Sequence, residues 1–176
     1  MTLHGRLAQL KHAVPALATL AAIYSAFHIG GIRINASPSL PIGLYKTTSD
    51  PTAKLVEFCP EEPFASLSVS RGYRIKGSCH DGAEPLMKPI VAVKGNVVVI
   101  SNKGITVNGK LLPNSTARLS DTKGRPLTHW PFGQYQVATG TVWVVSSFNS
   151  RSFDSRYFGP VPITAIRHHL RAIFTE

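Results

Sequence analysis

The chemistry in this chain could come from three short polar clusters that lie far apart in the sequence. The first is the serine cluster at 37–41, SPSLP, where prolines keep the backbone out of a helix and hold two hydroxyls, Ser37 and Ser39, at set angles. A serine hydroxyl is a poor nucleophile until a base takes its proton. Taken by itself, the stretch is more typical of an ordinary Ser/Pro turn, so the interpretation depends on finding a base.

The second cluster, at 85–96 (PLMKPIVAVKGN), offers that base. Lys88 lies among apolar residues, whereas Lys94 precedes Gly95-Asn96 and is the weaker candidate because it resembles a turn lysine. A lysine in an apolar strand either extends its amine to solvent or is buried. Burial disfavours the ammonium form and lowers the pKa, which makes a neutral amine available near pH 7–8 as a general base.

The third cluster, at 147–162 (SFNSRSFDSRYFGPVP), packs polar groups between two apolar segments. Such a loop must satisfy its own hydrogen bonds, so we expect Asp154 to pair with Arg156 and Ser152 to hydrogen-bond an amine. A Ser–His–Asp triad is disfavoured, because no histidine stands in a recognisable setting and no G-x-S-x-G elbow is present. A Ser–Lys dyad is a known variant of the same logic.

Strand-like patterns surround these clusters and predict a mainly β fold. We expect a strand at 55–58, two strands joined by a tight turn within 89–100, and a further pair within 134–147. Asn108-Gly109 predicts a hairpin within 104–112. The ITAI and LRAIF segments near the C-terminus favour strands over an amphipathic helix, and 113–133 should be the least regular part of the domain.

The N-terminal segment favours a single membrane anchor. Residues 13–32 carry no formal charge and would span about 30 Å as a helix. A cleaved signal peptide and a buried core helix are the alternatives. Arg6 and Lys11 precede the span and predict a cytoplasmic N-terminus. We therefore expect two parts, an anchor at 1–34 and a β-rich domain at 35–176, which in a Gram-negative cell would lie in the periplasm.

Charge and cysteine content narrow the possible partners. The net charge of +10 favours anionic partners, phospholipid or nucleic acid. A nucleic-acid-binding module is the alternative of another class, but no aromatic-basic stripe or helix-turn-helix supports it. The spacing of Cys59 and Cys79 does not fit a zinc site. The pair forms either a disulfide, if the domain is exported, or two separate buried thiols.

The three clusters, in this order, resemble the boxes of the type I signal peptidases, and more closely those of their conjugative-transfer branch, the TraF-type pilin peptidases. Asn35 to Tyr45 is similar to the serine box N-x-[ST]-P-S-x-P-x-G-L-Y of that branch. The lysine box aligns in register with 88–96, and 152–159 (SFDSRYFG) matches the final box N-S-x-D-S-R-Y-x-G. The branch also carries a cysteine pair placed like Cys59 and Cys79.

The resemblance implies a signal-peptidase-like catalytic domain and a serine endopeptidase without cofactor or metal. Ser39 would be the nucleophile and Lys88 the base, with Ser37 supporting the oxyanion, Ser152 orienting the amine and Arg156 holding Asp154. Whether Asp154 is catalytic or structural stays open.

The implied substrate is a conjugative pilin precursor at the inner membrane, cleaved and in some systems cyclised. A general signal peptidase acting on other exported preproteins is the alternative. The implied partners are thus a propeptide and membrane phospholipid, and no nucleic acid.

Overall fold

The computed structural model describes residues 14–15, 17–19, 22, 25 and 29–176. Most strands of the described chain form a seven-stranded sheet in the order β1-β2-β11-β3-β4-β9-β10. The bounds of these strands are β1 Ile32–Asn35, β2 Gly43–Thr48, β11 Ile166–Thr175, β3 Leu55–Phe58, β4 Leu86–Ala92, β9 Thr141–Val144 and β10 Val161–Pro162. The pairings between neighbours are antiparallel.

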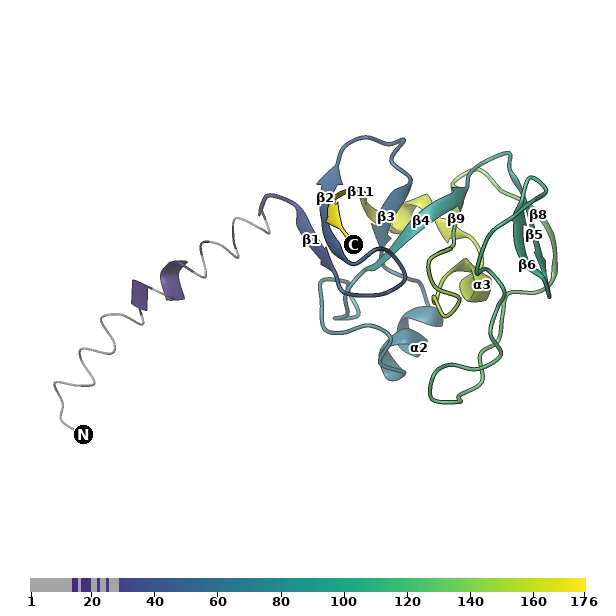
Figure 1. The fold of residues 1–176 in the computed structure, drawn as a ribbon, viewed down its shortest axis with the longest axis horizontal. Helices are drawn as coiled ribbons and strands as arrows, with labels where there is room; N and C mark the ends of the chain where they lie inside the picture. Colours follow the sequence, from purple (N-terminus) through teal and green to yellow (C-terminus); the bar gives the residue numbers. More distant parts are fainter. Residues whose placement is uncertain (1–13, 16, 20–21, 23–24, 26–28) are drawn as a thin grey trace.

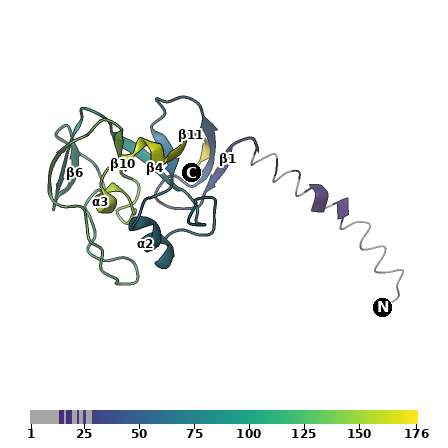
Figure 2. The same ribbon diagram turned by 180° about the vertical axis from the view of Figure 1, so that it is seen from behind.

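A second sheet of four strands has the order β7-β6-β5-β8. Its strands are β7 Lys110–Leu111, β6 Gly104–Val107, β5 Val97–Ser101 and β8 Gly133–Gln136. Figure 1 shows β5, β6 and β8 at one side of the body and β1, β2 and β11 at the other, and Figure 2 shows β6 opposite β1 and β11 from behind. The helical elements of the body are short: α2 Phe64–Ser70, α3 Ser155–Phe158 and the 3-10 turn η1 Ile163–Ala165.

Strand β9 connects two hydrophobic clusters. Val142 and Val144 belong to the first cluster, with Val56, Phe58 and Phe158. Trp143 and Val145, which point the other way in the alternation of a strand, belong to the second cluster, together with residues of the four-stranded sheet. Because both faces of β9 are buried, its sequence is a continuous apolar run rather than an alternating one.

The mainly β prediction is confirmed, and so are the two strands within 89–100 and the two strands within 134–147, but in neither segment are the two strands neighbours in a sheet. The strands within 89–100 are β4 and β5, and those within 134–147 are β8 and β9; in both segments the two strands belong to different sheets. The tight turns at 93–96 and 137–140 are therefore crossovers between sheets rather than hairpin loops. A local turn signal fixes a change of direction but not the partner strand.

Other local predictions had mixed outcomes. The Asn108-Gly109 hairpin is confirmed: β6 pairs with β7, and both turn residues have positive φ, 48° and 80°. The segment 163–166 is largely the 3-10 turn η1 and not a strand, whereas LRAIF is part of β11. Helix α2 was not predicted. It is only seven residues long and has no side-chain cap, so it leaves little sequence signal.

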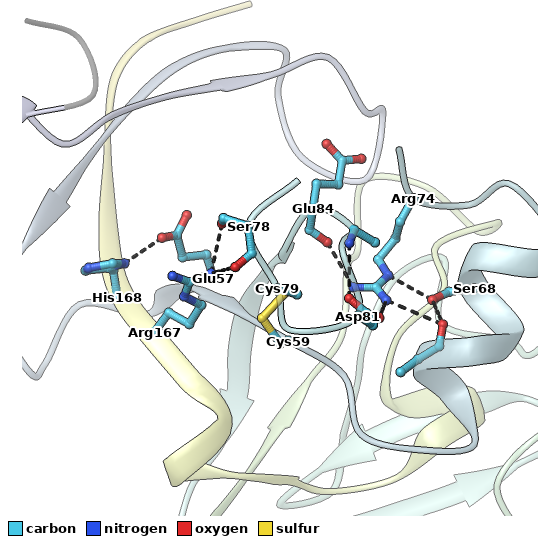
Figure 3. The surroundings of a disulfide bond; sticks show 12 residues. Glu57, Cys59, Ser68, Arg74, Ser78, Cys79, Asp81, Glu84, Arg167 and His168 are labelled. Carbon is cyan, nitrogen blue, oxygen red and sulfur yellow. Dashed lines mark hydrogen bonds and ion pairs between the residues drawn. A yellow bond between two sulfur atoms is a disulfide. The ribbon is translucent and has the colours of Figure 1, made fainter. Parts of the chain in front are cut away.

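The predicted disulfide between Cys59 and Cys79 is present. It joins the end of β3 to the loop that precedes β4 (Figure 3). In the same region the buried Arg74 donates to Ser68, to the Glu84 carbonyl and to the carboxylate of Asp81. The bridge and this arginine hold the loop 71–85 against the sheet that carries Lys88.

Part of the predicted membrane segment lies outside the described residues. Among the described residues, no helix is both long and apolar enough to cross a bilayer. Strand β1 begins at Ile32, so the sheet includes residues from the N-terminal side of the expected boundary at 34/35.

Candidate active site

The loop between β1 and β2 carries the candidate nucleophile. The Asn35 side-chain amide donates to the carbonyls of Ser37, Leu40 and Pro41, at 2.9, 3.2 and 3.1 Å, while its oxygen accepts from the Ser37 backbone N–H. One buried amide thereby folds residues 37–41 into a compact turn. Ser39 lies in this turn with only 5% of its surface exposed.

Strand β4 carries the candidate base. Leu86 and Ile90 contact the first hydrophobic cluster, and the strand alternation directs Lys88 to the same face. Lys88 lies opposite Val56 of β3 and is 4% exposed. The apolar sequence around Lys88 therefore buries its amine instead of letting it reach solvent.

The two side chains meet. Lys88 Nζ donates to Ser39 Oγ at 2.7 Å, although the residues are 49 positions apart. Burial lowers the pKa of Lys88 to about 8, an effect that the negative charge of Asp154 partly opposes. The Ser37 hydroxyl lies 2.9 Å from Ser39 Oγ and accepts from the Ser39 backbone N–H at 3.4 Å. A hydroxyl, an amine that can be neutral and a second hydroxyl thus share one site, which suits proton transfer followed by nucleophilic attack.

Asp154 and Arg156 form a fully buried ion pair in the same region. Arg156 Nε and Nη2 donate to the two carboxylate oxygens at 2.8 and 2.7 Å. The remaining donors of the guanidinium bond backbone carbonyls, those of Asn114, Ser146, Asn149 and Ser150. The pair expected from the sequence therefore fastens the loop 146–153, and Asp154 reaches Lys88 only through its charge.

A cavity of about 320 Å³ opens over the dyad. Ser37, Ser39, Lys88 and Ser152 line it, so the structure brings four of the candidate residues around one space. The Ser152 hydroxyl is buried and has no hydrogen-bond partner among the residues that the structure describes. The expected bond from Ser152 to the Lys88 amine is thus not formed, although a buried, unpaired hydroxyl beside the cavity is available to a bound peptide or to the amine.

Comparison with known families agrees with this arrangement. Residues 7–175 match the family described as signal peptidase, peptidase S26. The chain belongs to this family. Membership in the signal peptidase family implies serine peptidase activity, and the match covers the serine, lysine and aspartate clusters alike.

Relatives of this signal peptidase family member are named after plasmid or conjugal transfer. The chain is 36% identical over 151 residues to the plasmid transfer protein TraF of Escherichia coli, a match that covers 84% of this chain and 85% of that protein. It is 36% identical over 152 residues, 84% of each chain, to the conjugal transfer protein TraF of Agrobacterium fabrum. A crystal structure of a signal peptidase I from Enterococcus faecalis aligns with 70% of this chain and 98% of that one. Its TM-score of 0.38, at 15% identity, is too low to support an argument about the fold.

Ser146 belongs to the site of this peptidase family member, although no sequence pattern singled it out. Its hydroxyl donates to the Ser39 carbonyl and accepts from the Phe148 N–H at 3.2 Å, while its own N–H donates to Asp154 at 3.0 Å. Ser146 thus links the nucleophile turn to the buried ion pair. The 107 positions between Ser39 and Ser146 explain why only the fold reveals the contact.

Proposed function

We propose that this chain is a membrane-anchored serine endopeptidase that uses a Ser39–Lys88 dyad to process a conjugative pilin precursor. The observation that carries the proposal is the 2.7 Å contact between Lys88 Nζ and Ser39 Oγ, with the amine buried and its pKa lowered to about 8. At pH 7 about a tenth of such amines are neutral, enough to act as a general base.

The reaction begins when neutral Lys88 accepts the Ser39 proton. The alkoxide oxygen attacks the scissile carbonyl carbon and forms a tetrahedral intermediate. The ammonium then gives its proton to the leaving amine, the C–N bond breaks, and an acyl-enzyme ester remains on Ser39. Water, or the amine of the same substrate chain, attacks this ester and releases either a free acid or a new amide.

In this proposal, two groups stabilise the oxyanion. The backbone N–H of Ser39 and the Ser37 hydroxyl lie beside the attacking oxygen, and now make only a 3.4 Å contact with each other. Because this contact is long, the Ser39 N–H is weakly engaged and can donate to a developing negative charge, while the Ser37 hydroxyl, 2.9 Å from Ser39 Oγ, can rotate to do the same. Ser152, with its unpaired hydroxyl, can bond the Lys88 amine once the amine has left Ser39. Asp154 acts through Arg156 and Ser146, by holding the loop in place.

The names of the relatives support a transfer-related substrate. The proteins from E. coli and A. fabrum are named for plasmid or conjugal transfer, which favours a pilin precursor over general secretory preproteins. The acyl-enzyme permits both hydrolysis and cyclisation, and the product mass distinguishes them.

Exposed apolar residues next to the nucleophile turn support a position at the inner membrane, with the catalytic domain in the periplasm. Ile34, Ile42 and Phe174 are 72, 53 and 64% exposed. They lie at the same end of the neighbouring strands β1, β2 and β11, since Leu44 of β2 is opposite both Ile34 and Phe174. Such side chains at one edge fit the interface of a phospholipid bilayer.

The test is co-expression of the full chain with a candidate pilin, followed by intact mass measurement of the pilin. Wild type should shorten the pilin, and a product one water lighter than the hydrolysed chain would report cyclisation. Ser39→Ala and Lys88→Arg should leave the precursor intact, because guanidinium stays charged and cannot act as the base. Ser70→Ala, an exposed serine on α2, is the matched control and should process normally. Processing by Lys88→Arg would end the dyad proposal.

A further inference from the structure

The walls of the catalytic cavity carry an unbalanced positive charge. Apart from Lys88, the charged residues that line it are Arg118, Arg151 and Asp121. The carboxylate of Asp121 is already occupied, because Tyr73 donates to it at 2.6 Å and Arg125 Nε at 2.7 Å. Although burial by itself raises the pKa of Asp121, these hydrogen bonds keep it well below its usual range, so the group stays charged and paired.

Within the described residues, Arg118 and Arg151 have no such partner. Arg118 Nη2 donates to the neutral Ser150 hydroxyl at 3.0 Å, and the Arg151 backbone N–H bonds Asn149. In the described part of the chain, the arginines that form ion pairs with carboxylates are Arg33, Arg71, Arg74, Arg125 and Arg156. Two exposed arginine side chains therefore line the cleft without a carboxylate partner among the described residues.

The two arginines also come from elements that the fold holds firmly. The Tyr157 hydroxyl accepts from the Arg118 backbone N–H at 3.0 Å, which ties the segment 118–127 to helix α3. Arg151 lies in the loop that Arg156 fastens through the carbonyls of Asn149 and Ser150. Guanidinium groups on anchored backbones make good ligands for a carboxylate, which they bind through paired hydrogen bonds.

We infer that the cleft selects peptides with a carboxylate close to the scissile bond, and that Arg118 and Arg151 bind it. The carboxylate comes either from an Asp or Glu side chain or from the free C-terminus of a short leaving segment. The inference rests on the proposed function, because it assumes that peptides are cleaved at Ser39. A substrate carboxylate would supply the negative charge that pairs with Arg118 and Arg151.

A matched set of peptides tests the inference. The full-length protein in detergent is first given a proteome-derived peptide library, and its cleavage sites are determined by mass spectrometry. The best site is then synthesised with Glu or Gln at the enriched position, and with a free or amidated C-terminus. All four peptides, labelled with a fluorophore, are titrated into Ser39→Ala by anisotropy, which measures binding without cleavage. If the library yields no site, labelled Ala-Ala-Glu-Ala-Ala and its Gln counterpart are used, each with a free and with an amidated C-terminus.

The proteins compared are wild type, Arg118→Gln/Arg151→Gln and Lys123→Gln. Lys123 lies on the same 118–127 segment but does not line the cavity, so it controls for general basic charge. Wild type should prefer Glu to Gln, or the free to the amidated terminus, by about tenfold in kcat/KM or Kd. The double arginine variant should bring that ratio close to one, and Lys123→Gln should keep it.

Each outcome bears on one proposal. Ser39-dependent cleavage with no carboxylate preference, or a preference that the double variant retains, overturns the arginine assignment alone. Cleavage that survives Ser39→Ala overturns the proposed function. If Ser39→Ala binds the Glu and Gln peptides equally, and also binds the free and amidated peptides equally, the inference is overturned even where no peptide is cleaved. Thermal melts show whether the double variant is folded, and if it is not, the single Arg151→Gln variant gives the same comparison with a smaller expected change.

Discussion

Two buried ionisable pairs lie in the same region of this protein and differ in how fully they are hydrogen-bonded. Arg156 makes contacts with both oxygens of Asp154 and with backbone carbonyls, and neither side chain is exposed. The Lys88 amine, buried almost as deeply, has a hydrogen bond to Ser39 and no carboxylate within ion-pair distance in the described structure. The Asp154–Arg156 pair is thus saturated with hydrogen bonds, whereas the Ser39–Lys88 pair is unsaturated.

This difference in hydrogen bonding explains why one pair is rigid and the other can be reactive. A buried charge pair with every donor satisfied is held in one geometry and keeps its charge. Burial without a counter-ion destabilises the ammonium form of an amine. The pKa of the amine therefore falls, and its proton can be transferred near neutral pH. The saturated pair is therefore suited to fixing the loop 146–153, and the unsaturated pair to moving a proton.

Replacing Lys88, the base of the unsaturated pair, should lower the rate of cleavage more than any other substitution. It should also raise the stability of the fold. Lys88→Met should lower kcat/KM by at least about 10⁴-fold, since the dyad acts as a unit. At pH 7 it should also stabilise the fold by on the order of 3 kcal/mol, because the native state no longer holds an ammonium group whose pKa is lowered to about 8. Urea unfolding measures this gain.

The pH dependence of the stability difference between Lys88→Met and wild type serves as the control. In wild type, stability falls as pH drops from the ordinary lysine pKa of 10.5 to about 8, and stays low below that range. The advantage of Lys88→Met should hence be full at pH 7 and absent above pH 10.5. A variant less stable than wild type at pH 7 would contradict the idea that the amine is strained by burial.

Breaking the saturated pair should cost stability instead. Arg156→Met leaves the Asp154 carboxylate charged and buried, which should lower the free energy of unfolding by about 3–5 kcal/mol. Arg171→Met, on the exposed face of β11, is the matched control and should change it by less than about 0.5 kcal/mol. The double variant Asp154→Asn/Arg156→Met should recover part of the loss. A loss below about 1 kcal/mol for Arg156→Met would remove the distinction between the two pairs.

The activity of wild type should follow the titration of Lys88. Only the neutral amine accepts the Ser39 proton, so kcat/KM should rise about tenfold per pH unit up to a midpoint near pH 8 and then level off. Steady-state cleavage of one peptide between pH 5.5 and 9.5 measures the profile, and circular dichroism confirms the fold across the range. A midpoint near the ordinary lysine value of 10.5, or a flat profile, would assign proton transfer to another group.

The link between the two pairs should show the smallest effect. Ser146→Ala removes the hydroxyl that bonds the Ser39 carbonyl and should cost about 1–2 kcal/mol of stability. It should also lower kcat severalfold with little change in KM, since the nucleophile turn loses its anchor. Ser115→Ala removes a similarly buried, hydrogen-bonded hydroxyl beside β6 and should cost stability without changing kcat. Equal kcat for both variants would leave Ser146 a purely structural residue.

The sequence by itself determined the local properties. Prolines around Ser39, apolar residues around Lys88 and alternating β-branched runs each act over a few residues, so the strands, the Asn108-Gly109 turn and the candidate dyad could be predicted from them. The apolar setting of Lys88 was visible for the same reason, but the sequence left open whether its amine is buried or reaches solvent. The structure shows that the strand directs Lys88, between Leu86 and Ile90, toward the core.

Only the tertiary structure decided which distant segments meet. Neither turn signal revealed that β4 and β5, or β8 and β9, belong to different sheets. The contact of Ser146 with Ser39 and the gathering of Arg118 and Arg151 at the cavity were equally hidden. The physical reason is that strand pairing and charge balance depend on groups many positions apart, whose contacts form when the whole chain packs and leave no periodic pattern in the sequence.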